Sequence, residues 1–343
     1  MKHYVGLDVS MKKTSVCIVN EGGKIVHESI VNTDPHALAD VIEKIGLNIE
    51  LVGFESGSLS HYLMQGFRER ALNAVCIDAR KMSAILSLRV NKTDKNDARG
   101  IAEALRVRMF TRVHEKSREA IDTGMILAAR RTLINQRTQV KNCVRGLLKA
   151  YGIRMGSVGA TRFSKSVRSL LQGRDDGVII SIEALLSTFD HLNGEIEKID
   201  KKLLEMAALD KDIKLLTGIP GIGVITALTF KTEIFDPHRF PDSRSVGAYL
   251  GMTPKQYSSG EVQKQGQISK CGSKELRFLL VEAGLVVITR TRKWSRLKAW
   301  GLKLMRKKGV KKAALAVGRK LAVIMHRMLT TQKEFVYGEE KVA

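Results

Sequence analysis

The sequence predicts a mixed α/β N-terminal domain, a helical coiled-coil spacer and a mostly α-helical C-terminal domain. Three observations lead to this prediction. Short β-rich runs alternate with helical sequence at the start of the chain, an apolar heptad pattern occupies residues 182–206, and basic helical sequence dominates the remainder. We expect the three parts to span residues 1–115, 116–210 and 211–343.

The N-terminal part contains runs of β-branched and aromatic residues that are separated by turn residues, which is typical of strands. Strands are expected at 3–9, 14–19, 24–31, 50–54 and 73–77, and helices at about 35–46, 58–70 and up to about 107. The first three strands should form an antiparallel meander. The order β-β-β-α-β-α-β-α then predicts a mixed sheet that helices cover on both faces.

The predicted spacer contains a basic helical stretch at 119–151 and a second helix with the most regular pattern of the chain. Apolar residues alternate at spacings of three and four over this second helix: Ile182, Leu185, Phe189, Leu192, Ile196, Ile199, Leu203 and Met206. Such a seam pairs with another helix. We expect a coiled coil that joins copies into a homo-oligomer (a dimer or tetramer), and an intrachain hairpin with 119–151 is the alternative.

Charge is the strongest signal in the composition. The net charge is +23 and the isoelectric point is about 10.0, which indicates a polyanionic partner, nucleic acid before membrane. Residues 1–110 contain 15 Lys and Arg against 13 Asp and Glu, whereas residues 291–330 contain 13 Lys and Arg and no acid. A nearly neutral catalytic unit with basic nucleic-acid-binding surfaces behind it is expected; a basic solubilising face is the alternative.

Other features narrow the protein class. No apolar run is long enough to span a membrane, and residues 1–10 do not resemble a secretion signal, so we expect a cytoplasmic protein without a membrane partner. The four cysteines are scattered, which predicts buried thiols rather than disulfides. The eight histidines lack the spacing of a zinc site.

Four carboxylates in the first third of the chain could meet at one sheet edge. Asp8 lies inside the first strand, where a lone buried charge is costly, and Glu55 ends a strand. Asp94 and Asp97 project from one face of a helix start. Four hard oxygen donors suit two Mg²⁺ ions for phosphoryl transfer, although Asp94 alone could be a helix cap and Glu55 alone a surface charge.

These residues lie in stretches that resemble the DEDD transposases of bacterial insertion sequences (the IS110 family), which are related to Piv-type DNA invertases. The N-terminal stretches are YVGLDVSMKKTSVCIV, GFESGSLSHYL and NKTDKNDARGIAEAL, and the C-terminal ones are LLTGIPGIGVITALTF, FPDSRSVGAYLGMTP, SSG and ISKCGSKELRFLLVEAG. The resemblance covers nearly the whole chain and is weakest in 291–343. It implies a RuvC-like N-terminal domain of the ribonuclease H fold and a C-terminal transposase domain.

The resemblance also implies a mechanism. Ser259, directly before Gly260, matches the serine that family members are thought to use as a DNA-linked nucleophile; Ser258 is adjacent and Ser269 is a lesser candidate. From the residues alone, Ser-Ser-Gly is a polar loop. Because no His stands nearby in the sequence, activation would come from the metal ions in a composite site. The resemblance further implies strand exchange between element ends and target DNA, guided by a non-coding RNA of the element.

Residues 218–223 (GIPGIG) predict a glycine-rich hairpin that opens a helix and offers backbone N–H groups to phosphate, with Gly221 and Gly223 at the contact. A tight turn between packed helices is the alternative. Lys255, Lys270 and Arg277 are further candidate nucleic-acid contacts. Two other functions remain open: a junction endonuclease that uses water as its nucleophile, and a non-catalytic nucleic-acid-binding protein.

Overall fold

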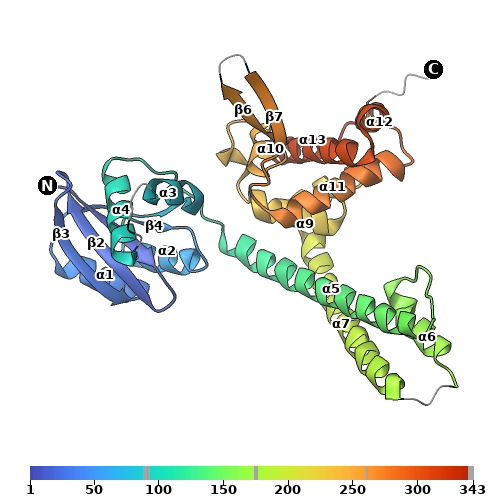
Figure 1. Ribbon diagram of the computed structural model, residues 1–343. Helices are drawn as coiled ribbons and strands as arrows, with labels where there is room; N and C mark the ends of the chain where they lie inside the picture. Colours follow the sequence, from blue (N-terminus) through green and yellow to red (C-terminus); the bar gives the residue numbers. More distant parts are fainter. Residues whose placement is uncertain (88–90, 92, 174–176, 260–261, 339–343) are drawn as a thin grey trace. The chain divides into compact units, whose positions relative to one another are not determined.

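The computed structural model describes residues 1–343 except 88–90, 92, 174–176, 260–261 and 339–343 (Figure 1). The chain divides into two compact units, Met1–Lys116 and Ser117–Ala343, here called unit 1 and unit 2. Within the described residues, no helix combines the length and the apolar character needed to cross a membrane.

Unit 1 is a mixed α/β domain, as the sequence predicts. Its elements are β1 (His3–Val9), β2 (Lys13–Asn20), β3 (Ile25–Asn32), α1 (Pro35–Lys44), β4 (Ile49–Glu55), α2 (Ser60–Glu69), β5 (Ala74–Ile77), α3 (Ala79–Leu86) and α4 (Asp94–Arg106). The five strands lie in the order β3-β2-β1-β4-β5. β1, β2 and β3 pair antiparallel, whereas β4 pairs parallel with both β1 and β5. The mixed sheet is therefore confirmed.

The two faces of this sheet bury different side chains. On one face, Leu7 and Phe54 are almost fully buried in a core that also contains side chains of α1 and α2. On the other face, the backbone of α4 approaches β1 so closely that a Cβ on Gly6 would lie 2.2 Å from the carbonyl oxygen of Ala98. Only glycine permits this approach, and it fixes the start of α4 against the second half of β1.

An ion pair also holds α4 on the sheet. Arg99 donates from Nε and Nη2 to the two carboxylate oxygens of Glu28 on β3, and Lys95 Nζ lies 2.9 Å from Glu28 Oε2. The hydrogen bond from Arg99 is the main reason why the pKa of Glu28 falls to about 2. The carboxylate therefore stays charged in all but strong acid.

Unit 2 begins with a helical arm of α5 (Arg118–Ala150), α6 (Ala160–Leu170) and α7 (Gly177–Leu209). α5 and α7 lie against each other, and the apolar seam of α7 faces inward: Phe189 and Leu203 are fully buried, and Ile182, Leu192 and Ile196 nearly so. The alternative interpretation, an intrachain helical hairpin of α5 and α7, is therefore the one that the structure shows. The expected coiled coil between copies is not supported, because these side chains are already covered within the chain.

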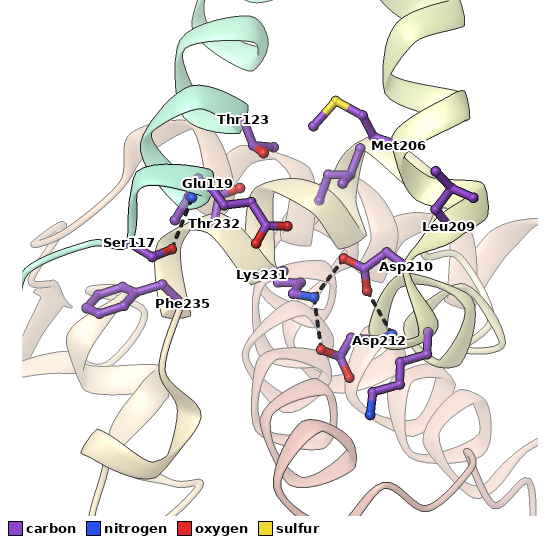
Figure 2. A pocket seen from close by; sticks show the side chains of 13 residues that line it. Ser117, Glu119, Thr123, Met206, Leu209, Asp210, Asp212, Lys231, Thr232 and Phe235 are labelled. Atoms are coloured by element: carbon purple, nitrogen blue, oxygen red, sulfur yellow. Dashed lines mark hydrogen bonds and ion pairs between the residues drawn. The ribbon is translucent and has the colours of Figure 1, made fainter.

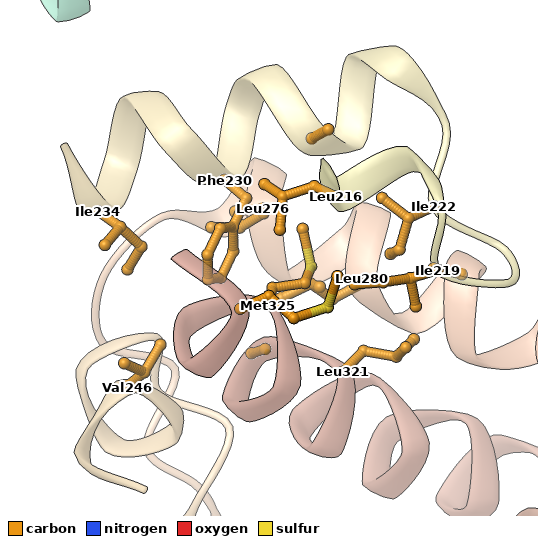
Figure 3. Close-up of a cluster of buried hydrophobic side chains, with 14 of the residues drawn as sticks. Leu216, Ile219, Ile222, Phe230, Ile234, Val246, Leu276, Leu280, Leu321 and Met325 are labelled. Atoms are coloured by element: carbon orange, nitrogen blue, oxygen red, sulfur yellow. The ribbon is translucent and has the colours of Figure 1, made fainter. Parts of the chain in front are cut away.

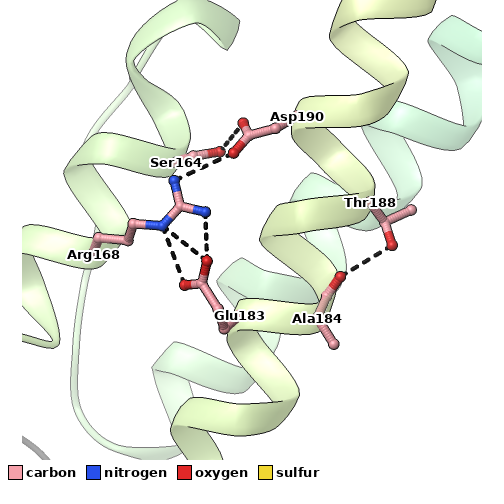
Figure 4. Close-up of polar contacts among 6 residues, drawn as sticks. All are labelled: Ser164, Arg168, Glu183, Ala184, Thr188 and Asp190. Atoms are coloured by element: carbon pink, nitrogen blue, oxygen red, sulfur yellow. Dashed lines mark hydrogen bonds and ion pairs between the residues drawn. The ribbon is translucent and has the colours of Figure 1, made fainter.

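Polar contacts complete the arm where α6 meets α7 (Figure 4). Arg168 donates to both oxygens of Glu183 and to Asp190, and Ser164 Oγ donates to Asp190 over 2.5 Å. Because the Arg168 and Glu183 side chains are about half exposed, this network fixes the angle of α6 more than it stabilises the arm.

The remainder of unit 2 is mostly helical. Its elements are α8 (Lys211–Thr217), α9 (Val224–Ile234), the short 3-10 helix η1 (Pro237–Arg239), α10 (Ser245–Tyr249), β6 (Pro254–Ser259), β7 (Val262–Ile268), α11 (Lys274–Thr289), α12 (Arg296–Lys308) and α13 (Val310–Thr331). One core joins the helices, with Phe230, Leu280 and Met325 among its fully buried members (Figure 3). The predicted basic tail is therefore partly core, since α13 buries one face.

Two expectations about this fold are wrong. Cys17 and Cys76 are buried, but Cys143 and Cys271 are exposed, because Cys143 lies on the outer side of α5 and Cys271 follows β7. The two serines of the Ser-Ser-Gly segment do not lie in an irregular loop: Ser258 and Ser259 end β6, which pairs antiparallel with β7 in a two-stranded ribbon.

Candidate functional site

The strands β1 and β4 carry Asp8 and Glu55 to the same edge of the sheet. The parallel register pairs Leu7 with Phe54, so Asp8 and Glu55 each follow the last paired residue by one position. Both are half-buried. Because side chains alternate along a strand, both lie on the face opposite Leu7 and Phe54, which is the face that α4 covers. The strand register therefore places Asp8 and Glu55 near the carboxyl ends of adjacent strands, as predicted.

The first turn of α4 contributes the other two carboxylates. Thr93, and not Asp94, caps this helix, since Thr93 Oγ1 accepts a hydrogen bond from Asn96 N. Asp94 is exposed, whereas Asp97 is 9% exposed. Within the described residues, the carboxylate of Asp97 has no hydrogen bond or ion pair. A mostly buried charge without a cation is costly, and the role of Asp97 as a metal ligand remains a prediction.

The approach of Gly6 to Ala98 brings the turn that contains Asp97 to the end of β1, where Asp8 lies. The side chains are not clustered, however: among the described residues, no three His, Cys, Asp or Glu side chains lie close enough to hold a metal ion. The expected ready-made two-metal cluster is therefore absent from the described part of the chain.

The chemistry of this donor set nevertheless fits a divalent cation. All four groups offer carboxylate oxygens, the ligands that Mg²⁺ prefers, and Asp97 is mostly buried without a cation. These residues lie on one face of unit 1, on strands and a helix that are packed together.

Ser259 is the last residue of β6 and pairs with Val262 across the ribbon. Gly260, which completes the Ser-Ser-Gly motif, lies outside the described residues. Lys255 on β6 and Lys270 after β7 are exposed, and Lys270 has a φ of 59°. The polar ribbon was not predicted because its strands contain almost no apolar residues that would mark a buried face.

Arg277 on α11 occupies a different setting from the one expected. Its Nη1 donates to the carbonyl oxygens of Leu250, Cys271 and Gly272. These bonds fix the turn between β7 and α11 to the end of α10. A phosphate contact through Arg277 remains a prediction, and it would have to use the other guanidinium nitrogens.

The glycine-rich segment before α9 is a tight turn between packed helices. Gly221 has a φ of +83°, and a Cβ there would lie 2.8 Å from the carbonyl oxygen of Ala283 on α11. Gly223 caps α9, and open space surrounds the position where its Cβ would lie. The packing explains Gly221 fully, while a phosphate contact at Gly223 remains a prediction.

Unit 2 also contains a cavity of about 640 Å³ that the sequence analysis did not identify (Figure 2). On its wall, Lys231 of α9 lies 2.7 Å from Asp210 and 2.9 Å from Asp212. Gln332 Nε2 also donates to Asp212. The two ion pairs connect the end of the arm to the helical core, and their spacing in the sequence matches no motif.

Two family models match this chain. The model described as "Transposase IS116/IS110/IS902 family" matches residues 213–299, and the DEDD transposase model of IS110 elements, described as "Transposase", matches residues 5–153. Together they take in more than half of the chain, and each contains one group of the candidate residues.

Curated relatives agree with these matches. The chain is 28% identical to the transposase for insertion sequence element IS1111A of Coxiella burnetii, over 97% of this chain and 91% of the relative. It is 29% identical to the transposase for insertion sequence element IS1328 of Yersinia enterocolitica, over 71% and 72%. From the two motif blocks and these matches, the chain belongs to the IS110/IS116/IS902 family of transposases and is a DNA transposase enzyme.

Proposed function

We propose that this transposase cuts and rejoins DNA at a metal-bound carboxylate site in unit 1, with Ser259 as its nucleophile. The observation that carries the proposal is Asp97, a mostly buried carboxylate without a cation partner in the described residues, at the sheet edge where Asp8 and Glu55 lie. The order of the strands in unit 1 supports a RuvC-like fold. The three-part division at 1–115, 116–210 and 211–343 belongs to the same proposal.

Asp8, Glu55, Asp94 and Asp97 would hold the cations, probed first as two Mg²⁺ ions. When bound, such ions neutralise charge on the scissile phosphate and polarise the attacking oxygen. The chain's own contribution is to orient these oxygens. β1 and β4 fix two of them through the parallel register, and the ion pair of Glu28 with Arg99 holds α4 in place.

Ser259 would attack the phosphorus of the strand being cut. Its Oγ forms a bond to phosphorus while the bond from phosphorus to the 3′ oxygen breaks. The hydroxyl proton passes to solvent, and the departing 3′ oxygen takes up a proton. The serine is then joined to the 5′ phosphate. One phosphodiester replaces another, so bond energy is kept for rejoining.

We also propose that a non-coding RNA of the element guides the choice of DNA. Nearly all of the net positive charge lies outside residues 1–110. Contacts between such charges and phosphates give affinity but little sequence information, and base pairing with a guide supplies the missing specificity. RNA that co-purifies with the protein and maps to the element would support this part, whereas cleavage at full specificity after RNase treatment and RNA removal would contradict it.

The serine is tested by trapping the covalent intermediate. Wild type, Ser259→Ala and Ser258→Ala are incubated with DNA of the element ends and Mg²⁺, then run on denaturing gels. Ser259→Ala should bind DNA and form no protein–DNA adduct, while Ser258→Ala should form one. An adduct with Ser259→Ala but not with Ser258→Ala moves the assignment by one residue. Efficient cutting by wild type without any adduct favours a water nucleophile, as in a junction endonuclease.

A further inference from the structure

Tyr257 is a large aromatic residue whose exposure the fold does not explain. It is 59% exposed on β6, and its neighbours on the ribbon, including Lys255, Gln256 and Gly266, are exposed too. Within the described residues, its ring and hydroxyl make no hydrogen bond or ring contact. A tyrosine ring combines a large apolar face with a polar tip, and such side chains are enriched at binding interfaces.

The ribbon gives this ring an open face. A Cβ on Gly266 would lie 3.2 Å from Tyr257 Cε2 and 3.7 Å from Lys255 Cβ, so these three residues share one face of the ribbon. Because Gly266 has no side chain, the ring lies over bare backbone on one side. Its other side is open to solvent, as the exposure of Tyr257 requires.

The backbone neighbours of Tyr257 in the ribbon include two lysines. Lys255 is on the same face, and Lys264 pairs with Tyr257 across the ribbon. The described residues of the ribbon, 254–259 and 262–268, contain no acid. An aromatic face flanked by positive charge is the arrangement that binds an unstacked nucleobase together with its phosphates.

The position of Ser259 relative to Tyr257 suits the same partner. The two residues are two positions apart in one strand, which corresponds to about 6.7 Å along the backbone. Stacked bases of one DNA strand are about 3.4 Å apart. A base on Tyr257 would therefore lie about two base steps from a phosphate at Ser259.

We propose that Tyr257 is a stacking platform that holds a nucleobase of the DNA strand near the phosphate being cut, and so positions that phosphate. The relation to cutting rests on the proposed role of Ser259, whereas the stacking itself does not. Tyr257 is a positioning residue, since its ring touches a base and not the reacting atoms. The alternative is that the ring only covers Gly266 and stabilises the ribbon.

Stacking is measured with a mixed-sequence DNA duplex that contains a four-nucleotide unpaired stretch with 2-aminopurine, whose fluorescence falls when the base stacks on an aromatic ring. Wild type and Tyr257→Phe should both quench it. Tyr257→Leu keeps the cover over Gly266 but lacks an aromatic face, so it should lose the quenching and bind this DNA about 5- to 100-fold more weakly. Gln256→Ala, an exposed change on the same strand, should match wild type.

The adduct assay on element-end DNA is run beside the stacking assay, so that the two proposals fail separately. Ser259→Ala should quench 2-aminopurine as wild type does, because stacking needs no nucleophile. If wild type quenches but forms no adduct, the serine mechanism fails while the platform stands. If wild type does not quench, or if folded Tyr257→Leu quenches and binds equally, Tyr257 is not a platform, whatever the adduct shows.

Discussion

The two units hold their candidate residues in opposite settings. In unit 1, Asp8 is the second-last residue of β1 and Glu55 is the last residue of β4, in a sheet that is packed on both faces and to which α4 is anchored. In unit 2, Ser259 ends a two-stranded ribbon whose residues Lys255 and Gln256 are exposed. The difference agrees with what each proposed chemistry would require. Metal ligands must agree in position to within about 0.5 Å, which a packed scaffold supplies, while a residue that reaches into DNA must be accessible.

The largest effect should come from the metal ligands. Asp8→Asn, Glu55→Gln, Asp94→Asn and Asp97→Asn each remove one negative oxygen at little cost in volume. Each should lower the rate of DNA cleavage about 1000-fold or more, equivalent to about 4 kcal/mol in the barrier. Single-turnover cleavage in Mg²⁺ measures this.

Asp40→Asn is the matched control, because Asp40 is an exposed acid of unit 1 that pairs with Arg70. It should cleave as wild type does. The melting temperature should rise with added Mg²⁺ for wild type and not for Asp97→Asn. Full cleavage by folded Asp97→Asn would show that Asp97 is not a metal ligand. The contrast between a buried metal site in unit 1 and an exposed serine in unit 2 would then no longer hold.

The same contrast explains what the sequence could predict. Some strands of unit 1 alternate apolar with polar residues and others are apolar throughout. Their order and the mixed sheet were therefore predictable. Leu192 and its heptad partners predicted a helix seam, but periodicity does not say which helix covers it. The ribbon has polar side chains on both faces, so no pattern marked it. The role of Gly221 depends on the carbonyl of Ala283, which is distant in the sequence.

The second effect concerns the arm of unit 2. Leu192 is 8% exposed in the seam of α7, so Leu192→Asp buries a charge without a partner and should lower the free energy of unfolding by about 3–5 kcal/mol. Leu204→Asp on the same helix, where Leu204 is 56% exposed, should cost less than about 0.5 kcal/mol. Circular dichroism during urea unfolding separates them. If both variants are equally stable and Leu192→Asp has a lower mass in light scattering, the seam joins copies of the chain, and the coiled coil between copies would be the correct interpretation.

The third effect distinguishes the units by their response to acid. The pKa of Glu28 is lowered from 4.5 to about 2, so the ion pair stabilises unit 1 fully above pH 4.5 and is lost as the pH falls toward 2. Glu28→Gln should cost about 1–3 kcal/mol at pH 7 and much less near pH 2. The loss of stability is measured by hydrogen exchange of peptides from β3 and α4. Glu43→Gln, an exposed pair with Arg70, should change little; equal protection in both variants at pH 7 would show that the Glu28 pair is not an anchor.

Unit 2 has its acid-sensitive group in the core rather than in an ion pair. His326 of α13 is 2% exposed; its Nε2 lies 2.8 Å from the carbonyl oxygen of Pro237 and its Nδ1 lies 2.9 Å from Ser243 Oγ. Burial is the main cause that lowers the pKa of His326 below 6.5; the neighbouring His238 and Arg239 lower it further, while the bond to Pro237 and the charge of Asp242 oppose the shift.

The fourth effect is a loss of stability in unit 2 that begins at mild acidity. The unfolded chain takes up a proton on this histidine near pH 6.5 while folded His326 stays neutral, so stability falls as the pH drops below 6.5 toward the folded pKa. Both tryptophans, Trp294 and Trp300, belong to unit 2, so their fluorescence follows its urea unfolding alone. His326→Gln should be less stable at pH 7.5 by about 1–3 kcal/mol and should show a flatter slope between pH 7 and 5. If the slope of stability against pH is the same in His326→Gln and wild type, His326 is not the acid-sensitive group of unit 2. The contrast between a buried histidine in unit 2 and the Glu28 ion pair in unit 1 would then be wrong.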